Sequence, residues 1–98
     1  MVEINELILQ FYQKKADANT PKYSFSPIDL YQGVKKIAED QKVEFNDSQR
    51  DFKKRITSLV NANVLEYWTS GSTTYIITHE RGNVIRQNQE GNLEKELQ

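Results

Sequence analysis

Residues 64–78 read VLEYWTSGSTTYIIT, in which two runs rich in β-branched and aromatic residues lie on either side of Ser70-Gly71-Ser72. Runs of this composition favour β-strands, and the small residues between them have the flexibility that a turn requires. The stretch therefore predicts a β-hairpin with strands at 64–69 and 73–78. Three segments precede this hairpin, and the spacing of their apolar residues is that of helices rather than strands.

Each of the three preceding segments has the apolar spacing of one helix face. The first predicted helix covers 4–16, the second runs from Pro27 to about Gln41, and the third covers 48–62. At the start of the second helix, Ser26 offers a capping hydroxyl and Asp29 places a carboxylate in the positive first turn. The apolar side chains expected to be buried by these helices are Ile4, Leu7, Ile8, Phe11, Leu30, Val34, Ile37, Ala38, Phe52, Ile56, Leu59 and Val60.

The segments around this framework complete the expected order. Residues 22–25 are predicted to be extended, and Thr78 can cap a short closing helix at 79–87 that turns Val84 and Ile85 inward. Residues 88–98 are polar apart from Leu93 and Leu97, and are expected to fray. The sequence thus predicts an α+β, mostly α chain with one domain at 1–87 and a polar C-terminal tail at 88–98.

Composition bounds the class of protein. A chain of 98 residues can bury one modest core. It has no Cys, so disulfides and thiolate metal centres are excluded, and no apolar run approaches the roughly 20 residues of a membrane span. Because no secretory leader pattern opens the sequence, we expect a cytoplasmic protein.

Two stretches carry a resemblance to a known superfamily. They are Leu59-Val60-Asn61-Ala62-Asn63-Val64-Leu65-Glu66 and Tyr75-Ile76-Ile77-Thr78-His79-Glu80-Arg81-Gly82. Over about residues 4–87 the chain resembles the winged helix-turn-helix superfamily, whose members often have Gly where Asn63 stands. Asn also tolerates the left-handed backbone that a helix end requires. More narrowly, the chain is similar to small winged-helix proteins of staphylococcal cassette elements, which are encoded near replication helicases and bind single-stranded DNA.

The charge is polarised along the chain although its net value is only −1. Residues 48–86 carry six basic and three acidic side chains, whereas the segments on either side are net acidic. Projecting the third helix at 100° per residue places its basic and hydroxyl or amide side chains opposite its apolar face. Such a face can neutralise phosphates and donate hydrogen bonds to them. The residues expected to bind nucleic acid on this helix are Arg50, Lys53, Lys54, Thr57, Ser58 and Asn61.

The hairpin adds a second candidate surface. Strand alternation places Tyr67 and Trp68 on opposite faces, so that one closes the core and the other is exposed. An exposed aromatic ring can stack on unpaired bases. From this region we take Trp68, Ser70, Ser72, Thr73 and Arg81 as further nucleic-acid-binding candidates. Core packing for the aromatic residue, and pairing of Arg81 with Glu80 or the acidic tail, remain alternatives.

Catalytic chemistry is not indicated. His79 is the only histidine, and Asp47 and Asp51 lack the companions that a hydrolytic or two-metal site requires. We therefore expect no enzyme activity, no metal and no cofactor. The resemblance implies a noncatalytic protein that binds DNA, single-stranded in preference to duplex, and assists replication of a mobile genetic element. Alternatives are a dimeric regulator of duplex DNA, with the first helix or Leu93 and Leu97 in its interface, or an adaptor that contacts a helicase or polymerase. The protein is expected to be a monomer or a homodimer.

Overall fold

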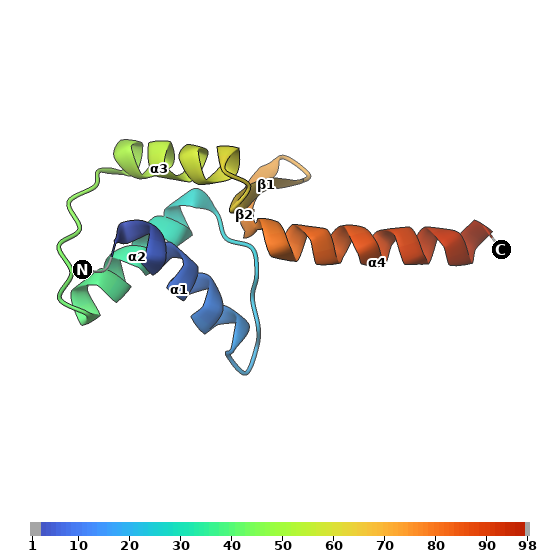
Figure 1. The fold of residues 1–98 in the computed structure, drawn as a ribbon, viewed down its shortest axis with the longest axis horizontal. Helices are drawn as coiled ribbons and strands as arrows, with labels where there is room; N and C mark the ends of the chain where they lie inside the picture. The colour runs from blue at the N-terminus through green and yellow to red at the C-terminus, as the bar shows by residue number, and fades with distance from the viewer. Residues whose placement is uncertain (1–2, 98) are drawn as a thin grey trace.

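The chain folds into four helices and one hairpin in the predicted order. The computed structural model describes the backbone of residues 3–97 and the side chains of residues 3–88. Figure 1 shows α3 lying over α1 and α2, with the hairpin at the C-terminal end of α3 and α4 leading away from it. This confirms an α+β, mostly helical chain. The elements are α1 (Ile4–Ala16), α2 (Pro27–Asp40), α3 (Gln49–Asn61), β1 (Leu65–Ser70), β2 (Thr73–Thr78) and α4 (His79–Leu97).

Serine caps define where α2 and α3 begin. The Ser26 hydroxyl accepts a hydrogen bond from the backbone N–H of Asp29 at 3.3 Å, and the Ser48 hydroxyl accepts one from Asp51 at 3.1 Å. Each bond satisfies one of the N–H groups that have no partner inside the helix. The capping prediction at Ser26 is confirmed, and these two caps set the direction in which each helix leaves its loop.

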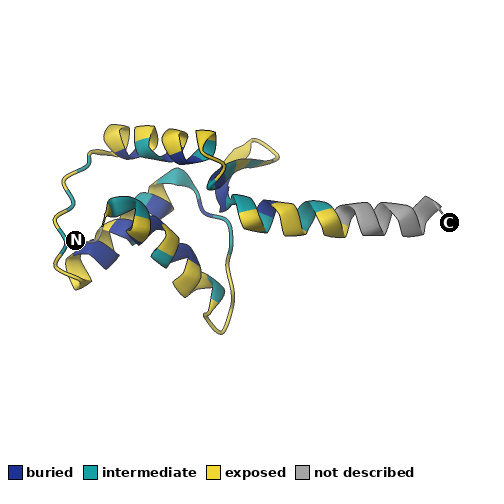
Figure 2. Ribbon diagram, in the orientation of Figure 1, coloured by how far each residue is buried: buried dark blue, intermediate teal, exposed yellow. Residues whose placement is uncertain are grey.

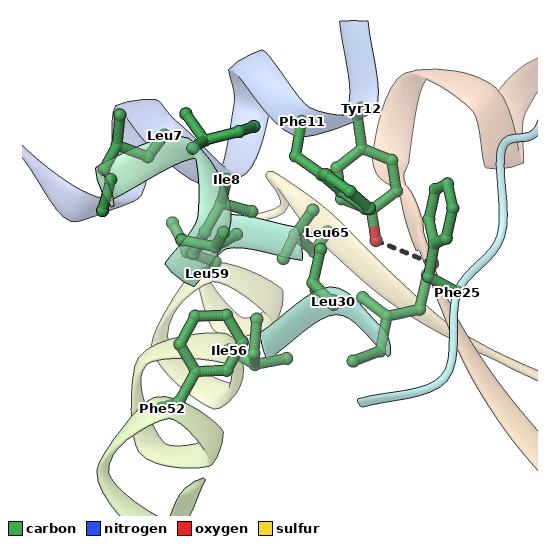
Figure 3. Packing of buried hydrophobic residues seen from close by; sticks show 14 residues of the cluster. Leu7, Ile8, Phe11, Tyr12, Phe25, Leu30, Phe52, Ile56, Leu59 and Leu65 are labelled. Carbon is green, nitrogen blue, oxygen red and sulfur yellow. Dashed lines mark hydrogen bonds between the residues drawn. The ribbon is translucent and has the colours of Figure 1, made fainter. Parts of the chain in front are cut away.

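The core forms where the three helices meet the hairpin (Figure 2). All the predicted inward positions of α2 are buried, as are Phe52, Ile56 and Leu59 of α3, whereas Ile4 and Val60 are only half-buried. Tyr12 was not expected inside, yet it is buried and its hydroxyl donates a hydrogen bond to the Ile76 carbonyl at 2.7 Å (Figure 3). Burial raises the pKa of the Tyr12 phenol above its usual value of 10. This bond ties α1 to β2.

A polar clamp holds the loop that leads into α3. Arg55 pairs with the Asp47 carboxylate at 2.9 Å, and the Tyr31 hydroxyl donates to the Asp47 carbonyl at 2.7 Å. Below this loop the Phe52 ring lies edge-on to Tyr31 and to Phe45, with ring centroids 5.4 Å and 5.9 Å away. Such edge-to-face pairs add to the stabilisation from burial. The clamp therefore fixes the N-terminal half of α3 against α2.

The hairpin pairs antiparallel from Leu65↔Thr78 to Ser70↔Thr73, and Gly71 at its tip has a φ of 62°. Phe25 pairs with Ile76 on the other edge of β2, with its backbone N–H and carbonyl both hydrogen-bonded to that residue. The extended segment predicted at 22–25 is thus realised as a single bridge at its end. The bridge closes the core between α1 and the hairpin.

Asn63 ends the third helix in the left-handed conformation anticipated for it, with a φ of 60°. Replacing Asn63 by Val is expected to lower the free energy of unfolding by about 1–2 kcal/mol, because a β-branched residue strongly disfavours this backbone. Asn63→Gly is the matched control and should preserve or slightly raise stability. Urea unfolding of both variants checks this, and equal stability of the two would contradict it.

The fourth helix is longer than predicted. It continues to Leu97 rather than ending near Gln87, because the part beyond Gln87 contains no proline and a single glycine, Gly91, which costs only about 1 kcal/mol of helix propensity. Val84 was expected inside but is 38 % exposed. The proposed interface role of Leu93 and Leu97 lies outside the side chains that the structure describes. Among the described residues, no helix combines the length and apolarity needed to span a membrane.

Candidate functional site

The exposed side of α3 carries the basic residues singled out in the sequence. Burial of Phe52, Ile56 and Leu59 at helical spacing orients the opposite side outward. Figure 2 shows this outer side as an almost continuous exposed band. All six α3 candidates are exposed: Arg50, Lys53, Lys54, Thr57, Ser58 and Asn61.

The three basic side chains of this face are available to a partner. The ion pairs formed among residues 3–88 involve Arg55, His79 and Arg86, and none involves Arg50, Lys53 or Lys54. An exposed charge without an internal partner keeps its hydration and its field at the surface. We call Arg50, Lys53 and Lys54 the basic rim.

An apolar groove runs beside the basic rim, between the start of α2, α3 and the hairpin. It consists of two adjoining hollows of about 260 Å³ and 210 Å³, both of which are lined by Pro27, Phe52 and Lys53. Ile28 of α2 and Tyr67 of β1 each expose 49 % of their surface at its two ends. We call these two hollows the α3 groove, and it brings exposed apolar surface next to unpaired positive charge.

Tyr67 is the aromatic residue that joins this surface, and it was not among the sequence-based candidates. The Thr57 hydroxyl donates to the Lys53 carbonyl at 3.1 Å, so the Tyr67 hydroxyl, 3.2 Å from the Thr57 oxygen, donates to Thr57. This contact holds the Tyr67 ring against α3. Strand alternation had shown that one of Tyr67 and Trp68 faces outward, but only the packing of β1 on α3 selects Tyr67.

The other candidates lie in different places. Trp68 is half-buried and, by strand alternation, lies on the opposite face of the hairpin from Tyr67. Ser70, Ser72 and Thr73 are exposed at the hairpin tip. The structure thus brings together the α3 candidates but separates Trp68 from them.

Arg81 is also separated from the α3 face. Its guanidinium carbon lies 3.9 Å from the centre of the Tyr23 ring, which belongs to the loop before α2. This geometry is that of a cation–π contact. Arg81 therefore belongs to a surface between α1 and α4.

A second polar cluster anchors α4 to the hairpin. The Glu66 carboxylate accepts hydrogen bonds from both terminal nitrogens of Arg86, at 2.9 Å and 3.0 Å, and lies 2.7 Å from Nδ1 of His79. Gly82 allows the close approach, because a Cβ there would overlap the Glu66 carboxylate. The Arg86 bonds hold the pKa of Glu66 below its usual value of 4.5, with a smaller lowering from His79 and an opposing effect of burial. His79 is thus structural here.

The lowered pKa of Glu66 predicts how stability depends on pH. A carboxylate with a lowered folded-state pKa stabilises the fold above its unfolded pKa, and this contribution disappears as pH falls through the folded value. Glu66→Gln should therefore be less stable than the parent chain at pH 7. The difference should shrink as pH falls from about 5 to about 3. Thermal unfolding of both chains across this range measures it, and a constant difference would show that the Glu66 charge is not involved.

Metal chemistry finds no support in the described part of the chain. Within residues 3–88 no three His, Cys, Asp or Glu side chains are grouped so that they could hold an ion. The candidate site on which the α3 residues converge is the α3 groove with its basic rim.

Comparison with known proteins links the chain to sulfur metabolism by name. Residues 4–81 match the model of a family described as dissimilatory sulfite reductase D (DsrD). The protein DsvD from Nitratidesulfovibrio vulgaris (strain Hildenborough) is 35 % identical over 74 residues, which is 76 % of this chain and 78 % of that protein. The family match at 4–81 includes α1 to α3 and the hairpin.

Two solved structures agree with this relationship. The neutron crystal structure of DsrD has a TM-score of 0.54 and 30 % identity, covering 82 % of this chain and 98 % of that one. A further crystal structure of DsrD has a TM-score of 0.52 and 29 % identity, covering 86 % and 99 %. The arrangement of helices and hairpin is therefore shared with structures of the same description.

These similarities correct the functional prediction. The narrower resemblance, to single-stranded-DNA-binding proteins of mobile elements, is wrong, because the matched family is DsrD. The predicted DNA replication function, its regulator and adaptor alternatives, and the DNA, helicase or polymerase partners are wrong for the same reason. A basic helix beside a hairpin does not by itself identify the partner, because proteins of one fold can use such a surface to bind unrelated partners.

Proposed function

The chain belongs to the dissimilatory sulfite reductase D family, and from this premise we propose that it is a noncatalytic accessory protein that binds dissimilatory sulfite reductase. The observation that carries the proposal is the family match over residues 4–81 together with the relative DsvD. The description of the family, dissimilatory sulfite reductase D, supports an association with this enzyme. The structure adds a surface suited to binding another protein.

The α3 groove supports a docking role. Protein interfaces combine a buried apolar centre with a polar rim that excludes water around it. Here the groove exposes Ile28 and Tyr67, and Tyr is among the residue types enriched at interfaces. The groove therefore suits an apolar side chain offered by a partner.

The charge of the rim indicates which surface of a partner it would meet. Arg50, Lys53 and Lys54 lie along one side of α3 without ion-pair partners among residues 3–88. Complementary charge raises the association rate and selects against wrong partners. We therefore expect the matching surface of the reductase to be acidic around an apolar side chain.

The composition supports an accessory rather than a catalytic role. Reducing sulfite requires a cofactor that transfers electrons, and iron–sulfur clusters are held by Cys thiolates. These 98 residues contain no Cys and a single His, which the Glu66 cluster engages. The proposal includes a cytoplasmic location alongside the enzyme.

We also assign the architecture to the winged-helix type, with the β1–β2 hairpin as the wing. Support comes from the order of three helices and a hairpin, and from the bridge of Phe25 to β2. The proposed domain covers residues 1–87, followed by a polar tail at 88–98. The family match at 4–81 is consistent with this boundary.

Direct binding tests the proposal. Sedimentation velocity of the chain with purified dissimilatory sulfite reductase should show a complex with a Kd of about 1 μM or tighter in dilute buffer, weakened by added salt. The rate of sulfite reduction, measured with and without the chain, reports whether binding alters catalysis. No sulfite reduction is expected from the chain alone. Failure of the two proteins to form a complex at low salt would refute the proposal.

A further inference from the structure

A third hollow lies away from the α3 groove and shares no lining residue with it. It has a volume of about 450 Å³ and is bounded by α1, the loop before α2 and the first turns of α4. Two exposed apolar residues, Leu9 (44 %) and Val84 (38 %), lie in its wall together with Tyr12 and Tyr23. Its volume is within the range of small-molecule sites. We call it the Arg81 pocket.

Arg81 places a partly unsatisfied guanidinium in this pocket. The Nε atom is buried and has no hydrogen-bond partner among the described residues, while one face of the group stacks on Tyr23 at 3.9 Å. The backbone N–H of Arg81 donates to the Thr78 hydroxyl, which fixes the helix start, and the Arg81 side chain forms no ion pair among residues 3–88. A buried donor without an acceptor is costly. The donors that Arg81 can offer to a ligand in the pocket are the N–H groups of its terminal nitrogens.

The stacking also determines how a ligand can approach. Because Tyr23 covers one face of the guanidinium, an acceptor would approach in the plane of the group, where its N–H groups point. A carboxylate matches the edge formed by the two terminal nitrogens with two parallel hydrogen bonds. Beside this edge the wall offered by Leu9, Ala16 and Val84 is apolar.

We propose that the Arg81 pocket binds a monocarboxylate attached to an apolar or aromatic group. The carboxylate pairs with Arg81, and the apolar group covers Leu9 and Val84. Burying those exposed side chains supplies the hydrophobic contribution, while the charged pair sets the orientation. This inference does not depend on the proposed binding of sulfite reductase, because it concerns a separate surface.

The pocket discriminates against small inorganic oxyanions. Sulfate or sulfite would have to give up strong hydration for one guanidinium and a largely apolar wall, which cannot replace those hydrogen bonds. Glu80 also lines the pocket and adds a negative charge that opposes a second charge on the ligand. A singly charged, partly apolar acid suits both features.

Binding of 3-phenylpropionate, followed by two-dimensional NMR of the ¹⁵N-labelled chain, tests the inference. Saturable shifts should be confined to the pocket-lining residues of α1, the loop and α4. The neutral amide of the same acid should bind at least about tenfold more weakly, because charge-assisted hydrogen bonds are roughly twice as strong as neutral ones. Equal binding of acid and amide, or tighter binding of sulfate, would overturn the proposal.

Variants assign the binding to this site. Arg81→Gln should weaken 3-phenylpropionate at least about tenfold, whereas Arg50→Gln, a change of the same kind on the α3 face, should leave it unchanged. Glu80→Gln should tighten binding, because it removes the opposing charge while retaining the side-chain shape. If Arg81→Gln fails to fold, Glu80→Gln still decides the matter. Unchanged affinity in Glu80→Gln and shifts outside the pocket would both count against the site.

The carboxylate could belong to a small organic acid or to the C-terminus of a polypeptide, and binding of a peptide distinguishes the two. A tetrapeptide ending in Phe with a free C-terminus is compared with the same peptide carrying a C-terminal amide. Tighter binding of the free peptide than of 3-phenylpropionate identifies the terminal carboxylate of a polypeptide as the source. Tighter binding of 3-phenylpropionate identifies a small organic acid. Lack of binding by every carboxylate refutes the inference.

Discussion

Replacing Arg50, Lys53 and Lys54 together by Glu is expected to weaken binding of the chain to dissimilatory sulfite reductase by roughly a hundredfold at low salt. Reversing charges at an interface turns attraction into repulsion, and like charges placed opposite each other cost several kcal/mol. The three side chains are exposed and lie outside the ion pairs of residues 3–88, so their reversal should spare the fold.

A matched variant shows whether the loss of binding depends on where the charges are reversed or only on the net charge of the chain. Lys14, Lys35 and Lys36 are exposed on α1 and α2, and their replacement by Glu changes the net charge by the same amount on another surface. Binding of this control should fall far less, and circular dichroism should show both variants folded. If both triple variants lose affinity equally, only the overall charge matters and the α3 groove is not the docking surface.

The Phe52→Ala substitution is expected to lower the free energy of unfolding by about 3–5 kcal/mol, a large part of the stability of a small domain. Phe52 is 1 % exposed and packs edge-on against the rings of Tyr31 and Phe45, so truncation leaves a cavity between α2 and α3. It also lines both hollows of the α3 groove. Phe52 therefore belongs both to the core and to the wall of the groove.

Urea unfolding of Phe52→Ala measures this cost. Ile28→Ala is the control, because Ile28 is 49 % exposed in the same groove and its loss creates no internal cavity. Its effect on unfolding should stay below about 1 kcal/mol, while binding to the reductase should weaken. A loss of stability as large in Ile28→Ala as in Phe52→Ala would contradict the packing described here.

The functional prediction failed at a definite step. The exposed basic side of α3 was recognised from spacing alone, but charge and shape do not identify the polyanion or protein that they meet. The chain has no local motif for sulfite reductase that composition or periodicity could reveal. Only similarity over residues 4–81 supplies the family, whereas the use of individual α3 side chains stays a prediction.

Among the structural predictions, most of those that rest on neighbours in sequence are confirmed. Helical periodicity, the Ser26 cap and the turn at Gly71 act within a few residues, so the sequence by itself determined the order and type of the elements. The end of α4 was missed because a propensity penalty of about 1 kcal/mol at Gly91 is too small to stop a helix.

Tertiary structure alone decided which side chains meet. The hydroxyl of Tyr12 donates a hydrogen bond to the carbonyl of Ile76, which lies 64 positions away in the sequence. Tyr67 rather than Trp68 contacts α3, and the Arg81 guanidinium stacks on the Tyr23 ring. Each of these contacts joins residues from different elements, and its formation depends on how helices and hairpin pack. The local sequence therefore specified the parts, and long-range packing selected the groove and the pocket that they form.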